Sequence, residues 1–127
     1  MTEKHRVLCI DDDAISLSFL EETLKDHYDV ALCIDSSEAL AAAVRFKPHV
    51  VVSDFSMPGF TGADLLSLFD TLPDTRNIPF LAFTAHANIE NLTELMKNGV
   101  RGLIEKPADP EFVLETVAYT IKHPTAI

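Results

Sequence analysis

The stretch Val50-Val51-Val52-Ser53-Asp54 decides the fold. Three consecutive β-branched residues fit a strand buried on both faces, as the strands of a parallel sheet are. Asp54 follows at the carboxyl end of this strand, which is the edge where open α/β sheets place their binding sites. The Pro58-Gly59 pair then forms a turn, so we expect the Asp54 carboxylate at the rim of a loop. A single strand-end aspartate caps a turn more often than it carries chemistry, and the rest of the chain must decide between the two.

Working outward from this strand, short apolar segments alternate with helical patterns along the chain. Leucines at helical spacing follow Asp13, and an alanine-rich run follows the capping pattern that begins at Asp35. Thr61 opens a third helix, and Asp109-Pro110 opens the last one with an acid at the N-cap and proline in the first turn. The further strands are expected at 6–10, 29–34, 80–84 and 100–104, and a fourth helix at 88–98, before Gly99. This alternation predicts an α/β fold, an open doubly wound five-stranded parallel sheet with five helices.

Composition restricts the classes of function. The chain of 127 residues has a net charge of -10, which disfavours direct binding to nucleic acid or to anionic membranes. Its length and uninterrupted pattern predict a single domain over 1–127 with a core at about 6–122. There is no apolar run of membrane-spanning length and no signal-peptide core, so we expect a cytoplasmic location. In that compartment Cys9 and Cys33 are expected to be reduced core residues.

Acidic and basic residues follow the strands at the edge where their carboxyl ends meet. Asp11-Asp12-Asp13, Asp54, Thr84 and Lys106 all occupy strand-end positions. Neighbouring carboxylates repel by about 1 kcal/mol per pair in water and about 4 kcal/mol at an effective dielectric of about 20. One lysine does not neutralise them, whereas an all-oxygen site with an open side suits Mg²⁺, which also accepts phosphate oxygens.

These groups together suit phosphoryl transfer. A carboxylate is a nucleophile towards phosphorus, and with a reference pKa of about 3.9 Asp54 is ionised at neutral pH. The metal and Lys106 would neutralise the charge on the phosphoryl oxygens, and the Thr84 hydroxyl would donate to one of them. Each residue alone has an ordinary structural explanation; the coincidence of all of them favours a site.

The motifs resemble a known family. Ile10-Asp11-Asp12-Asp13, Ser53 to Gly62, Phe83-Thr84-Ala85 and Glu105-Lys106-Pro107 are similar, in order and spacing, to the receiver domain of two-component response regulators. The likeness extends from about Arg6 to about Lys122. It implies a flavodoxin-like sheet with strand order 2-1-3-4-5 and a function as a phospho-acceptor signalling switch, not a classical enzyme.

The resemblance also implies roles for individual residues. Asp54 would take a phosphoryl group from a phosphohistidine of a sensor kinase or a histidine phosphotransfer domain, and the modified domain would control an effector protein or output domain. Mg²⁺ would be held by Asp11, Asp12, Asp54 and the main-chain carbonyl of Ser56. Thr84 and Lys106 would bind the phosphoryl oxygens, and Lys106-Pro107 would be a cis peptide.

Three further positions bear on signalling by the same resemblance. The side chains of Ser56 and His86 would flank the path of the water that removes the phosphoryl group; His86 is equally well an exposed loop histidine. Family members usually carry an aromatic switch residue at the position of Leu103. A leucine has no polar tip to reproduce that movement, and the simpler interpretation is a half-buried strand residue.

Other classes of function remain as alternatives. A flavodoxin-like cofactor binder needs a first loop rich in small residues, and the loop here is Asp11-Asp12-Asp13. A Mg²⁺-dependent phosphatase needs a general acid near its nucleophile, and the residue two after Asp54 is Ser56. A receiver-like docking module that is never phosphorylated would not need the acids, the threonine and the lysine.

Overall fold

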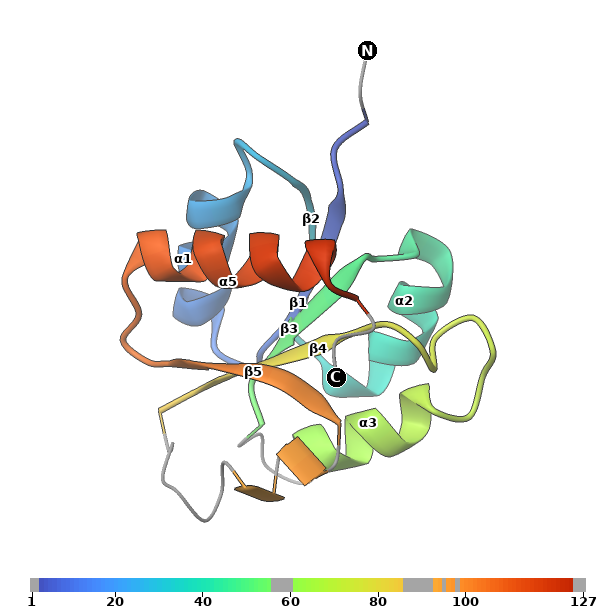
Figure 1. Ribbon diagram of the computed structural model, residues 1–127. Helices are drawn as coiled ribbons and strands as arrows, with labels where there is room; N and C mark the ends of the chain where they lie inside the picture. The colour runs from blue at the N-terminus through green and yellow to red at the C-terminus, as the bar shows by residue number, and fades with distance from the viewer. Residues whose placement is uncertain (1–2, 56–60, 86–92, 95, 98, 125–127) are drawn as a thin grey trace.

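The strands form one parallel sheet. A computed structural model describes residues 3–55, 61–85, 93–94, 96–97 and 99–124. Within these ranges the sheet has five strands in the order β2-β1-β3-β4-β5 (Figure 1), so the predicted sheet and strand order are confirmed. The strands are β1 (Arg6–Ile10), β2 (Asp29–Cys33), β3 (Val50–Ser53), β4 (Phe80–Thr84) and β5 (Val100–Glu105).

Helices cover both faces of the sheet. One face packs against α1 and α5, and the other against α2 and α3 (Figure 1). Their bounds are α1 (Ala14–Leu24), α2 (Ala39–Phe46), α3 (Gly62–Phe69) and α5 (Pro110–Lys122), with a short 3₁₀-helix, η1 (Ser36–Glu38), before α2. The longest of these, α5, has 13 residues. Within the described ranges, none of the helices has the length and apolar character needed to cross a membrane.

The position of β3 in the middle of the sheet explains its composition. All four of its residues are fully buried. Val50 and Val52 contribute to the core beneath α1 and α5, whereas Val51 contributes to the core beneath α2 and α3. A strand with helices on both faces needs apolar side chains at every position, and each buried valine contributes about 1.5–3 kcal/mol.

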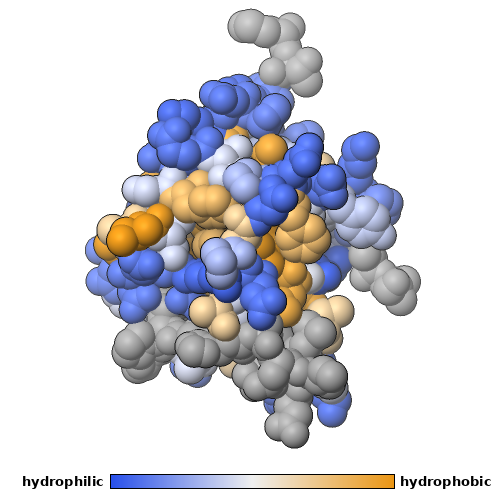
Figure 2. All heavy atoms as spheres, turned by 90° about the vertical axis from the view of Figure 1, so that its left-hand side faces the viewer, coloured by the Kyte–Doolittle hydropathy of each residue, from blue (hydrophilic) through white to orange (hydrophobic). Residues whose placement is uncertain are grey.

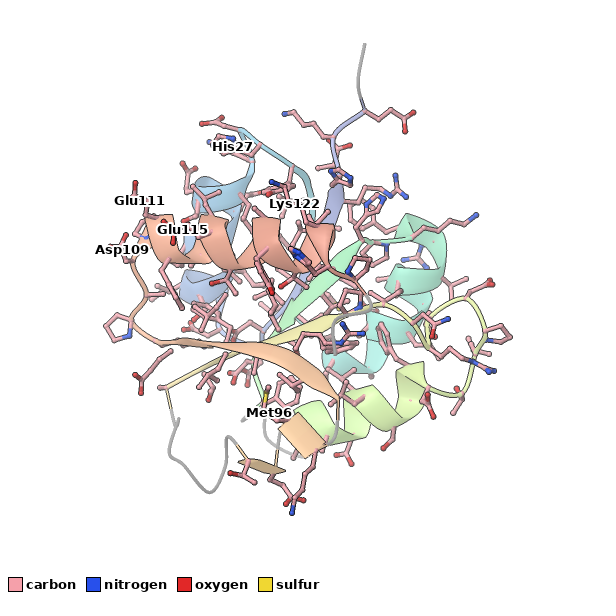
Figure 3. All side chains as sticks on the ribbon, in the orientation of Figure 1. His27, Met96, Asp109, Glu111, Glu115 and Lys122 are labelled. Atoms are coloured by element: carbon pink, nitrogen blue, oxygen red, sulfur yellow. The ribbon has the colours of Figure 1, made fainter. Side chains whose placement is uncertain are left out.

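Local capping positions the helices that follow the strand ends. The Asp13 carboxylate accepts a hydrogen bond of 3.1 Å from the Ile15 N–H, as expected for the N-cap of α1. Thr61 and Asp64 form a reciprocal capping box at the start of α3. At α5 the acidic residues Asp109, Glu111 and Glu115 lie near the start and Lys122 near the end (Figure 3), which complements the helix dipole.

The structure differs from the predicted elements in several details. The described residues form four α-helices instead of five, because the predicted helix at 88–98 falls mostly on residues outside the described ranges; residues 93–94 and 96–97 within it are helical. The strand β2 ends at Cys33, one residue before the predicted end. The Asp35 side chain then caps η1 through the Ser37 N–H at 3.0 Å, so it does not cap α2 directly.

Candidate functional site

Backbone hydrogen bonds bring Asp11 and Asp54 side by side. Ile10 and Ser53 are paired in the ladder between β1 and β3. The Asp54 N–H continues that ladder by donating to the Ile10 carbonyl at 3.0 Å, and the Asp11 N–H donates to the Cys33 carbonyl at 3.1 Å. Asp11 is fully buried and Asp54 is 9% exposed, so both residues are buried at the carboxyl edge of the sheet.

Lys106 reaches both carboxylates from the end of β5. Its Nζ lies 2.8 Å from Oδ2 of Asp11 and 3.5 Å from Oδ2 of Asp54. The main-chain N–H of Lys106 donates to the Thr84 carbonyl at 2.9 Å, and the side-chain ammonium lies 4.9 Å from the centre of the Phe83 ring. These contacts place one positive charge against two negative charges, with an aromatic face beside it.

A group of three carboxylates has the chemistry of a cation site. One oxygen from each of Asp11, Asp12 and Asp54 lies within 4.8 Å of the other two, and Asp12 is exposed. Lys106 pairs with two of these acids, which leaves an excess of negative charge. An all-oxygen donor set that opens to solvent fits a hard divalent ion such as Mg²⁺.

The protonation of the site follows from burial and charge. Burial raises the pKa of the Asp11 carboxyl above its ordinary value, although hydrogen bonds from Lys106 and the Asp13 N–H oppose this, and the charge of Asp54 adds to the rise. Burial acts to lower the pKa of the Lys106 ammonium, but the hydrogen bond and charge of Asp11, together with Asp54, outweigh it and raise the pKa. Lys106 therefore stays charged, and the ionised form of Asp11 is costly without more positive charge.

The other predicted site residues lie in different settings. Thr84 is buried at the end of β4, and its carbonyl accepts a hydrogen bond from the main-chain N–H of Lys106. Asp13 faces α1, where hydrogen bonds from Ile15 and Ser16 hold the pKa of its carboxyl below its ordinary value. Leu103 is half-buried in β5, opposite Ala82. The peptide bond before Pro107 is cis. Ser56 and His86, for which roles were predicted, lie outside the described residues.

Two contacts at the site were not apparent from the sequence. One is the Phe83 ring beside the Lys106 ammonium. The other is the close approach of Gly62 to Phe55, the residue directly after Asp54. A methyl group at Gly62 would overlap the Phe55 ring. In the sequence, Phe83 and Gly62 belong to the Phe83-Thr84 and Thr61-Gly62 pairs of the motifs. Neither pair indicates which side chains are in contact.

An apolar hollow adjoins the site and was not predicted. It has a volume of about 330 Å³ and lies between α1, the end of β4 and the loop after Lys106. Its walls include Ile15, Phe19, Pro107 and Ala108, and Ile15 is 79% exposed. Apolar side chains gather on this side of the molecule and charged residues surround them (Figure 2). The hollow also includes Lys106, so the ion-pair site and the apolar surface are continuous.

Comparison with known proteins identifies the family. The family model of the response regulator receiver domain matches residues 7–118. The chain therefore belongs to the response regulator receiver domains of two-component signalling, which are signalling domains and not classical enzymes.

Individual relatives agree in sequence and in structure. The response regulator PleD of Caulobacter vibrioides is 30% identical over 82% of this chain and 23% of its own length. A 14.6 kDa uncharacterized protein of Leptolyngbya boryana is 31% identical over 82% of this chain and 80% of its own length. The solved chemotaxis response regulator CheY4 of Vibrio cholerae has a TM-score of 0.84 at 30% identity, covering 91% of this chain and 98% of that chain. The chain thus spans less than a quarter of PleD but most of the two smaller proteins.

Proposed function

We propose that this chain is a phospho-acceptor switch in which Asp54 accepts a phosphoryl group from a phosphohistidine. An Asp54 carboxylate oxygen attacks phosphorus, a P–O bond forms, and the P–N bond to the donor histidine breaks with its electron pair remaining on the imidazole nitrogen. The observation that carries the proposal is the meeting of Lys106 with both Asp11 and Asp54, at 2.8 Å and 3.5 Å. Such a meeting of charges suits a group that arrives with negative oxygens.

Each residue has a defined part in this reaction. Asp11, Asp12 and Asp54, with the Ser56 carbonyl, would hold Mg²⁺, which supplies positive charge to the phosphoryl oxygens when bound. The Lys106 ammonium orients one phosphoryl oxygen, and the Thr84 hydroxyl donates to another. The donor histidine leaves as a stable base, so no general acid of this chain is required. Hydrolysis of the resulting aspartyl phosphate, which Ser56 and His86 would modulate, resets the switch.

The apolar hollow fits the surface on which the donor docks. A phosphohistidine must reach Asp54, and the hollow includes Lys106, whose Nζ lies 3.5 Å from Oδ2 of Asp54. Exposed Ile15 and the partly buried Phe19 offer apolar area for a helix of a histidine kinase or phosphotransfer domain. Because both kinds of donor occur in the cytoplasm, we place the domain there, where Cys9 and Cys33 remain free thiols as the structure has them.

The output of the switch follows from added charge. Modification adds about one negative charge to Asp54 at neutral pH, which strengthens its attraction for Lys106 and the Thr84 hydroxyl. Leu103 lies half-buried on the strand that precedes Lys106 and cannot donate a hydrogen bond. We therefore infer that the change reaches an effector protein or output domain through the Thr84 segment.

Intact-mass spectrometry after treatment with acetyl phosphate tests the proposal. The wild type should gain one phosphoryl group in the presence of Mg²⁺ and much less in its absence. Asp54→Ala should gain none, while Asp26→Asn, which alters an exposed aspartate far from the site, should behave as the wild type. If the wild type gains no mass with Mg²⁺, the chain is a docking module and the proposal fails.

A further inference from the structure

The ring of Phe83 is held in place where it meets Lys106. Phe83 lies near the end of β4 and is 3% exposed. Its ring is stacked on that of Phe19 in α1, with the ring planes 16° apart and the ring centres 6.1 Å apart, which is a favoured arrangement of aromatic pairs. The Lys106 ammonium lies over the Phe83 ring, 4.9 Å from its centre. The ring is therefore a rigid surface in contact with the end of a flexible side chain.

Lys106 benefits from such a surface because its side chain is long. A lysine side chain loses much rotamer freedom when its ammonium is held in one place. The negative face of an aromatic ring attracts an ammonium within about 6 Å of the ring centre, and the attraction is stronger where water is excluded. The side chain of Lys106 is 19% exposed and Phe83 is almost fully buried, so this contact is largely shielded from water. The ring thus restricts the positions that the ammonium can take.

The ring contact differs from the two ion pairs of Lys106 in what competes for it. The Lys106 Nζ lies 2.8 Å from Oδ2 of Asp11 and 3.5 Å from Oδ2 of Asp54. In the proposed function both acids also hold Mg²⁺, and Asp54 becomes bonded to phosphorus, so neither is fully available to the lysine during the transfer. The Phe83 side chain has no atom that would bind the metal or the phosphoryl group. Its attraction for the ammonium therefore persists in the transition state, which is where an interaction must act to change the rate.

We propose that Phe83 is a positioning residue for phosphoryl transfer, whose ring holds the Lys106 ammonium within reach of the oxygens of the incoming phosphoryl group. The effect on the rate rests on the proposed function, whereas the contact between the ring and the ammonium does not. Because Phe83 acts through Lys106 alone, its removal should change the lysine and the rate in ways that the loss of a purely structural ring would not.

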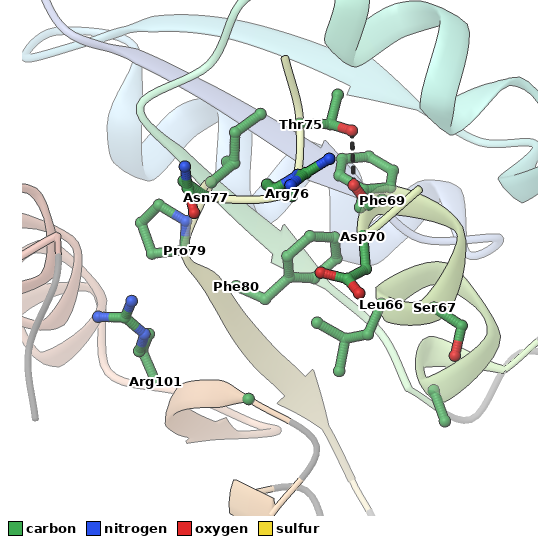
Figure 4. A pocket seen from close by; sticks show the side chains of 13 residues that line it. Leu66, Ser67, Phe69, Asp70, Thr75, Arg76, Asn77, Pro79, Phe80 and Arg101 are labelled. Atoms are coloured by element: carbon green, nitrogen blue, oxygen red, sulfur yellow. Dashed lines mark hydrogen bonds between the residues drawn. The ribbon is translucent and has the colours of Figure 1, made fainter. Parts of the chain in front are cut away.

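Phe80 provides a matched control on the same strand. It is also a phenylalanine of β4 and is 1% exposed. At the amino end of the strand, beside a cavity that Arg101 also lines, its ring contacts that of Phe69 edge to face, with ring centres 4.9 Å apart (Figure 4). Phe80 and Phe83 belong to the cores on opposite faces of the sheet. Phe80→Leu therefore removes a buried ring without touching the surroundings of Lys106.

Proton NMR of the protein without Mg²⁺ tests the contact directly. Protons over the face of an aromatic ring are shielded, so the Hε signal of Lys106, identified by its loss in Lys106→Met, should lie upfield of that of the exposed Lys25. The signal should return to its ordinary position in Phe83→Leu and stay shifted in Phe80→Leu. An unshifted Lys106 signal in the wild type would overturn the inference, whatever the outcome of phosphorylation.

The rate of phosphorylation by acetyl phosphate at saturating Mg²⁺ tests the role. Phe83→Leu should slow the reaction about threefold to tenfold, the range expected for a cation–π contact, whereas Phe80→Leu should react as the wild type does. A ring-fluorinated phenylalanine introduced at position 83 keeps the shape of the ring but weakens its negative face, so it should give an intermediate rate. Thermal unfolding shows whether each variant is folded, and the fluorinated variant carries the test if Phe83→Leu is not.

The same rates in a Lys106→Met background separate positioning from a structural role. Once the ammonium is absent, adding Phe83→Leu should change the rate by less than about twofold, because the two side chains act as a unit. The inference is overturned if removing or fluorinating the ring leaves the rate of a folded variant unchanged, if Phe80→Leu is slowed equally, or if Phe83→Leu slows Lys106→Met as much as it slows the wild type. If the wild type itself gains no phosphoryl group, the proposed function fails instead, and the NMR comparison still decides whether the ring holds the lysine.

Discussion

Lys106 donates a hydrogen bond of 2.8 Å to Asp11, a residue 95 positions earlier in the chain. The Asp11 side chain is fully buried and that of Lys106 is 19% exposed, so solvent screens this ion pair much less than a surface pair. The bond joins the ends of β1 and β5, two strands that are not neighbours in the sheet. It therefore serves both the stability of the carboxyl edge and the charge balance around Asp54.

Replacing Lys106 by methionine should reduce both stability and phosphorylation. The substitution leaves the buried Asp11 carboxylate without its cation, and we expect a loss of about 2–3 kcal/mol in the free energy of unfolding, somewhat below that of a fully buried pair. Urea denaturation at pH 7 measures the loss. Lys25→Met, which removes the exposed pair with Glu22, is the matched control and should cost less than about 1 kcal/mol. Equal costs for the two variants would contradict this assignment of the Lys106 contact.

Mg²⁺ should stabilise the folded chain. The pKa of Asp11 is raised above 3.8 in the fold, so this carboxyl favours folding below pH 3.8 and that contribution is lost as the pH rises through its folded pKa. At neutral pH the ionised group is a cost that a cation offsets. At about 100 times its dissociation constant, Mg²⁺ should add about 2.7 kcal/mol to the free energy of unfolding.

The unfolding of an Asp12→Asn variant at the same Mg²⁺ concentration checks the source of this effect. Asp12 is exposed and belongs to the carboxylate group, so its loss should reduce the gain from Mg²⁺ without disturbing the core. Asp26→Asn should keep the full gain. A gain in Asp12→Asn as large as that of the wild type would show that the ion binds elsewhere.

Acidification should weaken the fold through His49. Burial lowers the pKa of this imidazole below 6.5, and the charge of Arg6 adds to the effect. Its Nδ1 accepts a hydrogen bond of 2.9 Å from the Arg6 N–H, which a protonated ring cannot accept. The unfolded chain therefore binds more protons, so the stability that is present above pH 6.5 decreases as the pH falls below it and through the lower folded pKa. The slope for one proton is at most about 1.4 kcal/mol per pH unit.

His49→Asn should flatten this part of the stability profile. The amide oxygen of asparagine can take the place of Nδ1 as acceptor but does not titrate. Chemical denaturation between pH 5 and 7 on the wild type, His49→Asn and the exposed-histidine control His27→Asn makes the comparison. An unchanged profile in His49→Asn would assign the pH dependence to other groups.

Adding a methyl group at Gly62 should disturb the segment after Asp54. The new Cβ would overlap the base of the Phe55 ring, which cannot move aside without moving its backbone. We expect Gly62→Ala to cost about 1–3 kcal/mol and to slow phosphorylation by acetyl phosphate. Gly102→Ala is the control, since its Cβ would lie 3.1 Å from Cδ2 of Leu81, the mobile end of a side chain. Its phosphorylation rate should match that of the wild type, and equal slowing in both variants would remove the special role of Gly62.

The five strands, the caps at Asp13, Thr61 and Asp109, and the strand-end acids were all predictable from the sequence. They depend on interactions between residues within a few positions of each other: a run of β-branched residues favours a strand buried on both faces, and a carboxylate before a helical pattern caps its first turn. A period of two or of 3.6 residues records these preferences directly. The family motifs add the strand order, which local preferences do not contain.

Tertiary packing decided the rest. Asp11, Asp12 and Asp13 are chemically equal in the sequence, yet Asp11 is buried against Lys106, Asp12 is exposed and Asp13 caps α1. Likewise, nothing around Arg101 predicts that its Nη1 is buried beside a cavity. Burial and charge pairing are properties of surfaces brought together from distant parts of the chain, so the sequence by itself determined which groups this protein carries, and only the folded arrangement determined which of them meet.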